Sequence, residues 1–224
     1  MQKVNVITVN LNNKDGLRRT IESVIGQTCF NLIDYIVIDG DSTDGSKDVL
    51  EDYWSMIYHI TSEKDSGIYN AMNKGIDAAN DDYCIFLNSG DYFYGCNVVR
   101  KMCERLDADI VYGDLMIHQA NPKDGCFKKE YTDEIPDDYF TYEALPHEAA
   151  FVRTDLLKRK RFHEDYRIIS DTIFFYEAIV EEKATYRHEN CVVTNFFLGG
   201  VSSNYPKVER EKRRYFEEKG KFIV

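Results

Sequence analysis

The 224-residue sequence has no excess of positive charge and no long apolar run. It contains 28 Lys and Arg against 39 Asp and Glu, a net charge of −11, whereas a non-specific nucleic-acid binder needs positive charge to neutralise phosphates. No stretch approaches the roughly 18 uninterrupted apolar residues of a membrane-spanning helix. Hydrophobic residues still make up 43% of the chain and aromatic residues 13%, which argues against disorder. We therefore expect one folded domain over residues 1–224, since a domain takes about 150 residues.

Two common sequence signatures are also missing. The six cysteines are scattered and form no C-x-x-C pair, so no disulfide framework is indicated. The N-terminus has no basic region followed by an apolar run, which is the pattern of a secretory leader. We therefore predict a cytoplasmic protein with reduced thiols. No G-x-G-x-x-G follows the first predicted strand, which argues against a dinucleotide-dependent oxidoreductase.

Apolar periodicity alternates between strands and helices along the first half of the chain. Short β-branched runs predict strands at residues 4–9, 35–38, 57–60, 84–87 and 110–112. Amphipathic helices are predicted between them, opened by the caps Asp15 and Asp44 or spanning residues 68–79 and 98–106. This alternation is typical of an α/β fold in which helices flank a mostly parallel central sheet.

The second half of the chain is less regular. We predict strands at residues 127–131, 149–152, 185–188 and 192–197, and a helix at 171–180. No Ser/Gly linker separates this half from the first, so we interpret it as an integrated lobe of the same domain.

Three carboxylates crowd the turn after the second predicted strand, namely Asp39, Asp41 and Asp44. Like charges this close raise one another's pKa unless a cation or hydrogen-bond donors satisfy them. Turn and capping preferences explain Asp44 but not Asp39, which stands at the very end of the strand. Ligands of open α/β sheets bind outside the carboxyl ends of the strands, so we predict a functional role for Asp39.

A second polar strand end carries Asn88 and Asp91. A carboxylate beside amide and hydroxyl oxygens suits a divalent cation that bridges phosphates, and a surface turn is the alternative. Before the third predicted helix, residues 63–67 place Lys64 and backbone N–H groups where an anion can bind. Capping by Asp65 explains the same residues.

Together these motifs resemble those of the family 2 glycosyltransferases, the large inverting group with a GT-A fold, and most of all the bacterial polysaccharide-assembly type. The resemblance is strongest over residues 3–115, in TVN at 8–10, VIDGDSTDG at 37–45, EKDSGIYNAMNKG at 63–75 and FLNSGD at 86–91. Looser similarities are PHEAAF at 146–151, ISD at 169–171 and GGVS at 199–202. The resemblance implies a GT-A-like domain with a nucleotide-sugar-binding half at 1–115, an acceptor-side half at 116–205 and a basic C-terminal helix at 206–224.

The resemblance implies a donor site for a nucleoside diphosphate sugar, with UDP favoured. Asp39 matches the acid that hydrogen-bonds the base, and Thr8 and Asn10 line the same pocket. The other residues expected to bind the nucleotide sugar are Asp41, Lys64, Asp65 and Asn88.

A divalent metal, Mn²⁺ or Mg²⁺, is the cofactor that the resemblance implies. Asp91 matches the acid of the family's Asp-x-Asp metal motif. Asn88 stands where an Asp is usual, and an amide is a weaker cation ligand than a carboxylate. We therefore expect modest metal affinity.

The resemblance assigns Asp171 as the catalytic base that deprotonates the acceptor hydroxyl. A helix cap is the alternative role, because Asp171 precedes an apolar helical run. His147 is expected to bind the acceptor or the leaving phosphate, with a purely structural histidine as the alternative. The implied reaction transfers a sugar to a glycan or lipid-linked acceptor with inversion, in polysaccharide biosynthesis.

Two other functions remain open at this point. Asp39-x-Asp41-x-Thr43 after an apolar strand resembles the nucleophile loop of haloacid-dehalogenase-like phosphatases, in which the first Asp is phosphorylated. That loop normally continues into apolar residues, whereas Asp44 follows here, and the late acidic pair of that family is missing. The other alternative is a catalytically silent nucleotide-sugar-binding domain on the same fold.

The negative charge is unevenly distributed. Residues 206–224 contain seven Lys and Arg against four Glu, or 7 − 4 = +3, which leaves −14 on residues 1–205. A basic helix carrying Tyr215, Phe216, Phe222 and Ile223 suits peripheral contact with an anionic membrane. Docking of these side chains on the protein body is the alternative.

Overall fold

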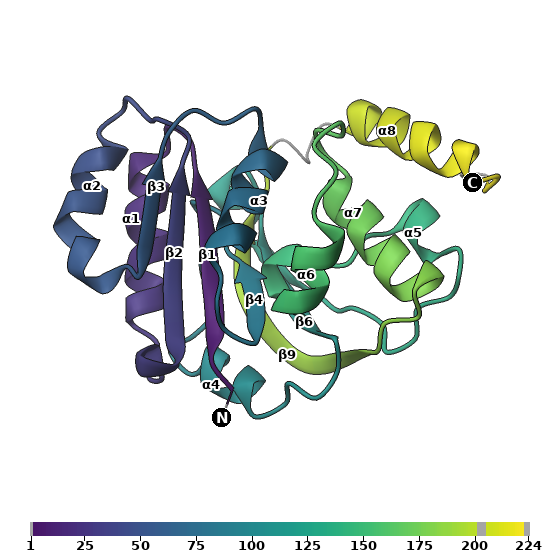
Figure 1. Ribbon diagram of the computed structural model, residues 1–224, viewed down its shortest axis with the longest axis horizontal. Coiled ribbons are helices and arrows are strands. Elements are labelled where there is room, and N and C mark those ends of the chain that lie inside the picture. Colours follow the sequence, from purple (N-terminus) through teal and green to yellow (C-terminus); the bar gives the residue numbers. More distant parts are fainter. Residues whose placement is uncertain (1, 201–204, 222–224) are drawn as a thin grey trace.

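The computed structural model describes residues 2–200 and 205–221, and within them one nine-stranded sheet carries helices on both faces (Figure 1). The strand order is β3-β2-β1-β4-β8-β6-β9-β5, with β7 paired to β6. The strands are β1 Val4–Asn10, β2 Ile33–Asp39, β3 His59–Ser62, β4 Tyr83–Phe86, β5 Tyr92–Phe93, β6 Ile110–His118, β7 Cys126–Lys129, β8 Ala150–Arg153 and β9 Tyr186–Phe197.

The pairing differs between the two halves of the sheet. β3, β2, β1 and β4 are all parallel neighbours. β8 pairs antiparallel with both β4 and β6, whereas β9 runs parallel to β6. The predicted α/β class with helices on both faces is confirmed, and the parallel pairing that defines it lies mainly in the first half.

The described helices cover the sheet in two groups. They are α1 Lys14–Ile25, α2 Ser46–Tyr53, α3 Ile68–Ala78, α4 Val98–Cys103, α5 Tyr139–Tyr142, α6 Thr154–Lys160, α7 Ser170–Phe175 and α8 Tyr205–Glu218. Short 3-10 turns lie at Phe30–Leu32, Trp54–Met56, Pro122–Asp124 and His147–Ala149, and a π-helical turn at Tyr176–Glu181. None of these helices is both long enough and apolar enough to cross a bilayer.

Two hydrophobic cores lie on opposite faces of the sheet because side chains alternate along each strand. On β1, Val4 and Val6 face the core that α1, α2 and α4 cover, whereas Ile7 and Val9 face the other. That second core is covered by α3, α6, α7 and α8. All four of these β1 side chains are buried, as expected for a strand inside an α/β sheet.

The starts of two helices differ from the prediction. Asp15 lies in the first turn of α1, and the cap is Asn13, whose Oδ1 accepts a hydrogen bond from Gly16 N at 3.2 Å. A capping side chain bonds the N–H two or three residues ahead of it, which Asn13 can do and Asp15 cannot. Asp44 acts from one residue before the N-cap of α2, because its Oδ1 accepts from Ser46 N at 3.0 Å.

Several boundaries in the second half also differ. The two strands predicted at 185–188 and 192–197 are one continuous strand, β9, because β6 extends to His118 and pairs with β9 across two register shifts. The helix predicted at 171–180 is the short helix α7 followed by the π-helical turn.

The C-terminal helix α8 docks on the protein body (Figure 1). Tyr215 and Phe216 are buried in the same core as α7, and Tyr215 Oη donates to Glu177 Oε1 at 2.8 Å. These two aromatic side chains are therefore not free to enter a membrane. Phe222 and Ile223, the other apolar residues of that prediction, lie outside the described residues, as do Val201 and Ser202 of the GGVS motif.

Candidate active site

The carboxyl ends of β1 and β2 place two of the predicted donor residues side by side. The parallel register pairs Asn10 directly with Asp39. Asn10 Nδ2 donates to Asp39 Oδ1 at 2.8 Å, and Gly40 N donates to Asn10 O at 2.9 Å. The parallel register thus brings the polar ends of β1 and β2 together, as the strand-end rule predicts.

Asp39 is fully buried and ionised. Burial alone would raise its pKa, but hydrogen bonds from Ser42, Asn10 and Ser62 outweigh burial and hold the pKa below its usual range. Oδ1 accepts from Asn10 Nδ2 and Ser42 Oγ, and Oδ2 accepts from Ser42 N and Ser62 Oγ. A carboxylate offers about four lone-pair positions, so direct contact with a base requires one of these donors to move aside.

Asn10 and Thr8 differ in what they offer a ligand. Asn10 Oδ1 is buried and accepts no hydrogen bond from the described residues. Thr8 is fully buried, donates to Leu87 O at 2.8 Å and accepts from Tyr35 Oη at 3.0 Å. The prediction that Thr8 lines the pocket is therefore wrong, because its hydroxyl is used beneath the site.

The loops after β2 and β3 approach each other closely at Gly40. A Cβ at Gly40 would lie 2.6 Å from Asp65 Oδ2, so a larger residue there would displace the Asp65 side chain. Asp65 Oδ1 accepts from Gly67 N at 3.0 Å, at the start of α3. Asp41 lies at the exposed rim, where its ion pair with Lys47, aided by the charge of Lys64, lowers its pKa.

Asp171 and His147, predicted separately from the second half of the chain, are in direct contact. His147 Nδ1 lies 2.7 Å from Asp171 Oδ2, and His147 Nε2 lies 3.2 Å from Glu148 Oε1. Burial alone would lower the pKa of His147, but the negative charges of Glu148, Asp171 and Asp91 raise it to about 9. At neutral pH His147 is therefore an imidazolium that donates to Asp171.

Asp171 is an ionised carboxylate with 14% of its side chain exposed. Burial alone would raise its pKa, but His147, Thr172 N and Tyr69 Oη together lower it. Oδ1 accepts from Thr172 N at 2.8 Å and Tyr69 Oη at 3.1 Å, whereas the described residues fill only one position of Oδ2. The helix-cap alternative is wrong, because the N-cap residue of α7 is Ile169 and Asp171 bonds its own neighbour.

Asp91 is buried with too few donors. Its Oδ1 accepts from Phe197 N at 3.1 Å. Burial and the negative charge of Glu148 raise the pKa of Asp91 well above its usual range, and the charge of His147 offsets this only in part. A carboxyl group in this state gains most from a nearby cation.

Three residues of this cluster were missed by sequence reasoning. Glu148 lies between His147 and the buried β8, and it was available in the PHEAAF motif. Tyr69 lies inside the EKDSGIYNAMNKG motif but was taken only as part of a helix. At neither position does the spacing of apolar residues along the sequence distinguish a site residue from a core residue. The third, Glu211 of α8, gave no signal in the sequence.

Comparison with known proteins decides the family. The model of the family described as Glycosyl transferase family 2 matches residues 5–178. The chain belongs to this family. An uncharacterized glycosyltransferase of Mycobacterium tuberculosis is 33% identical over 207 residues, which cover 90% of this chain and 77% of the relative. A putative teichuronic acid biosynthesis glycosyltransferase of Bacillus subtilis is 35% identical over 91 residues, 39% of this chain and 36% of the relative.

Solved structures share the fold of this glycosyltransferase at low sequence identity. Staphylococcus aureus TarS 1–349 in complex with UDP-GlcNAc has a TM-score of 0.74 at 17% identity, over 95% of this chain and 64% of TarS 1–349. The mannosyltransferase PcManGT of Pyrobaculum calidifontis, in complex with GDP-Man and Mn²⁺, has a TM-score of 0.68 at 14% identity, over 93% of this chain and 61% of PcManGT. The predicted GT-A-like fold is thereby confirmed. The phosphatase alternative loses its support, because the family differs and the Asp39 carboxylate already accepts hydrogen bonds from donors within the protein.

Asp91 and Asn88 of the glycosyltransferase suit a divalent cation whose remaining ligands come from water and a substrate. No group of three or more His, Cys, Asp or Glu in the described residues could hold a metal by itself. The charge of His147 offsets the burial of Asp91 only in part, and Asn88, whose amide lies 3.1 Å from His147 Nε2, supplies a neutral oxygen. Two protein oxygens, completed by water and diphosphate oxygens, are a usual environment for Mg²⁺.

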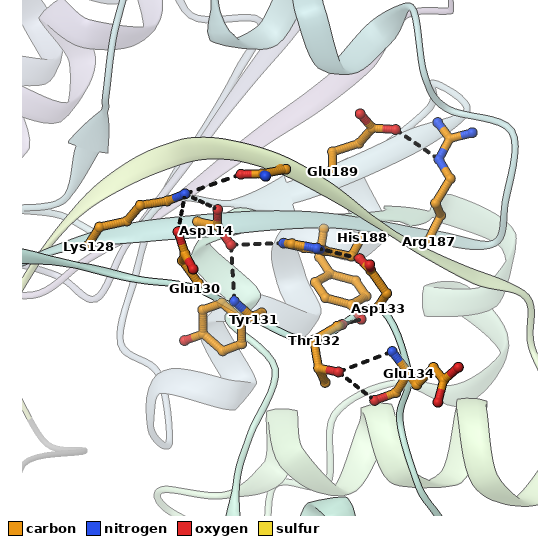
Figure 2. Close-up of polar contacts among 12 residues, drawn as sticks. Asp114, Lys128, Glu130, Tyr131, Thr132, Asp133, Glu134, Arg187, His188 and Glu189 are labelled. Atoms are coloured by element: carbon orange, nitrogen blue, oxygen red, sulfur yellow. Dashed lines mark hydrogen bonds and ion pairs between the residues drawn. The ribbon is translucent and has the colours of Figure 1, made fainter.

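A second polar network of the glycosyltransferase joins β6, β7 and β9, and Figure 2 shows it in close-up. Asp114 on β6 is fully buried, and it receives His188 Nε2 at 2.8 Å, Lys128 Nζ at 3.0 Å and Tyr131 N at 3.1 Å. His188 Nδ1 also lies 2.8 Å from the exposed Asp133. These contacts fasten the segment after β7 onto β6 and β9.

Proposed function

We propose that this glycosyltransferase moves a sugar from a nucleoside diphosphate sugar to a hydroxyl of a glycan or lipid-linked acceptor, with inversion at the anomeric carbon. The observation that carries the proposal is the His147–Asp171 pair, an ionised carboxylate held by an imidazolium beside the polar end of β4. The Bacillus subtilis relative, named for teichuronic acid biosynthesis, supports a role in polysaccharide assembly.

The donor site in this proposal lies at the ends of β1 and β2. Asn10 Oδ1 and, after a donor moves aside, Asp39 meet the base, while Asp41, Lys64 and Asp65 lie along the rim toward the sugar. UDP is the favoured nucleotide, as in the TarS complex, and GDP is the competitor, as in the PcManGT complex.

The reaction in this proposal is a single displacement. Asp171 Oδ2, which keeps an open lone pair, accepts the proton of the acceptor hydroxyl. The hydroxyl oxygen then bonds to the anomeric carbon, and the bond to the diphosphate oxygen breaks with its electron pair on the leaving group. His147 keeps the carboxylate oriented and ionised. Asp91 and Asn88 would hold a Mn²⁺ or Mg²⁺ ion, which would neutralise charge on the diphosphate.

The test is the Asp171→Asn variant. Asparagine keeps the size of the side chain but cannot accept the proton, so we expect transfer to fall between about 10²- and 10⁴-fold. The affinity for UDP, measured by isothermal titration calorimetry, should stay unchanged. Asp165→Asn is the matched control, because Asp165 is exposed and precedes the same helix.

Two outcomes would contradict the proposal. Full transferase activity of Asp171→Asn would remove Asp171 from the role of base. Binding of UDP without turnover on any acceptor would favour a silent nucleotide-sugar-binding domain. Peripheral membrane contact through residues 206–224 stays a prediction, which co-sedimentation with anionic liposomes tests.

A further inference from the structure

The segment just before Asp171 is held by a residue from a distant helix. Residues 167–169 lead into α7, whose N-cap position has no side-chain cap hydrogen bond. Instead, three successive backbone N–H groups donate to the carboxylate of Glu211 on α8. Their N···O distances are 3.0, 2.9 and 3.3 Å from Arg167, Ile168 and Ile169 in turn. Hydrogen bonds to an ionised acceptor are about twice as strong as neutral ones.

The same segment is held on its other side by α3 and the residues just before it. Tyr69 Oη lies 2.5 Å from Ile168 O and 3.1 Å from Asp171 Oδ1, so its proton is shared between the two acceptors. The guanidinium of Arg167 donates to Ser66 O, one residue before Gly67. The backbone N–H groups of residues 167–169 are therefore held by Glu211 of α8, and the carbonyl oxygen of Ile168 is held by Tyr69 of α3.

Helix α8 is itself firmly placed, so Glu211 has little freedom. Tyr215 and Phe216 are buried in the core shared with α7. Lys212 is also buried and donates to Glu143 O at 3.1 Å. Its neighbour Glu211 is thereby directed at the backbone of residues 167–169.

We infer that Glu211 is a positioning residue for the catalytic carboxylate. It does not touch the reacting atoms. It fixes the backbone of residues 167–169, and this backbone sets where Asp171 Oδ2 lies relative to the acceptor hydroxyl. The inference rests on the proposed function, since it takes Asp171 as the base. It also gives the basic C-terminal helix a role that does not require contact with a membrane.

The activity test compares Glu211→Gln and Glu211→Ala with the wild type. A misplacement of about 1 Å costs up to 10²-fold in rate, so we expect kcat to fall roughly 10- to 100-fold, with the larger loss in Glu211→Ala. Gln keeps one acceptor oxygen, so partial retention of kcat is expected in that variant. The dissociation constant for UDP should change much less than kcat, because the hydrogen bonds that hold Asn10 and Asp39 come from neither Glu211 nor residues 167–169.

The matched control is Glu209→Gln on the same helix. Its carboxylate is exposed and pairs with Arg213 at 2.9 Å, one turn along the helix. We expect this variant to keep the wild-type kcat. If Glu209→Gln lowers kcat as much as Glu211→Gln, the effect belongs to the charge of α8 and the inference is wrong.

A second readout does not depend on activity. Amide hydrogen exchange by NMR should show protection of the N–H groups of residues 167–169 in the wild type and its loss in Glu211→Ala. Loss of protection together with the fall in kcat supports the inference. Loss of protection with an unchanged kcat per folded molecule overturns it, as does unchanged protection. A lower melting temperature alone, with normal kcat, would show a purely structural role.

The two proposals fail in distinguishable ways. If Asp171→Asn is fully active, Asp171 is not the base, and the exchange data still report whether Glu211 holds the segment. If Asp171→Asn is inactive but Glu211→Ala is as active as the wild type, the proposed function stands and the positioning role falls.

Discussion

At the scale of single residues, three buried carboxylates of the site differ in how their charge is balanced. Donors within the protein lower the pKa of Asp39 and Asp171 despite burial. The pKa of Asp91 is instead raised, because burial and Glu148 outweigh its one backbone donor. Asp91 is therefore the carboxyl group of the site that depends most on an added cation.

This difference between the carboxylates predicts that the enzyme requires a metal ion and that metal binding depends on Asp91. We expect Mn²⁺ to strengthen UDP binding at least tenfold, or about 1.4 kcal/mol, and EDTA to abolish transfer. The Asp91→Asn variant should bind UDP equally well with and without Mn²⁺ by calorimetry. Asp82→Asn, an exposed position near the opposite end of β4, is the control. Undiminished turnover in EDTA would refute the requirement.

At the scale of elements, the network around Asp114 holds β7 and the segment after it onto β6 and β9 (Figure 2). The carboxylate of Asp114 has no exposed surface, so Lys128 supplies its counter-charge and His188 a hydrogen bond. Sequence reasoning did not single out Asp114, because its partners come from 14 and 74 residues away.

The Asp114→Asn variant should be markedly less stable. Removing the charge leaves His188 and Lys128 with only their exposed partners Asp133 and Glu130, and each hydrogen bond to a charged group is worth about 1.5–3 kcal/mol. Urea denaturation measures the loss. Asp133→Asn removes the exposed end of the same network and should cost less than about 1 kcal/mol. Equal losses in both variants would contradict the assigned role of burial.

At the scale of the whole molecule, the helix α8 closes over α7 and the π-helical turn, and one of its basic side chains, Lys212, is buried there. Glu177 in that turn receives Tyr215 Oη, His163 Nε2 and Lys160 Nζ. Burial alone would raise the pKa of Glu177, but hydrogen bonds from His163 and Tyr215 lower it to about 2.

This lowered pKa predicts acid sensitivity of the docked helix. A carboxylate with a depressed folded-state pKa stabilises the protein above its ordinary pKa, and that contribution is lost as the pH falls from about 4.5 toward about 2. The contribution is of the order of 3 kcal/mol. The free energy of unfolding of Glu177→Gln should therefore vary less over this range than that of the wild type. Identical pH profiles would contradict this.

Much of the first half of the fold could be predicted because its information is local. Strand and helix periods are read from neighbouring residues, and parallel strands that end in Asp39 and Asn88 must meet at one edge of the sheet. The continuous strand β9 was missed because its length depends on pairing with β6. The burial of Thr8 was missed because it depends on Tyr35 and Leu87.

The sequence by itself determined the family, the α/β class and the strand-end motifs, since each is a pattern over a short stretch of chain. Only the tertiary structure decided that His147 meets Asp171, that Asp39 is already satisfied and that Glu211 reaches residues 167–169. The physical reason is that the charge state and position of a buried group depend on neighbours far away in sequence. The net charge of −11 could not reveal which carboxylates the protein itself neutralises and which require a cation.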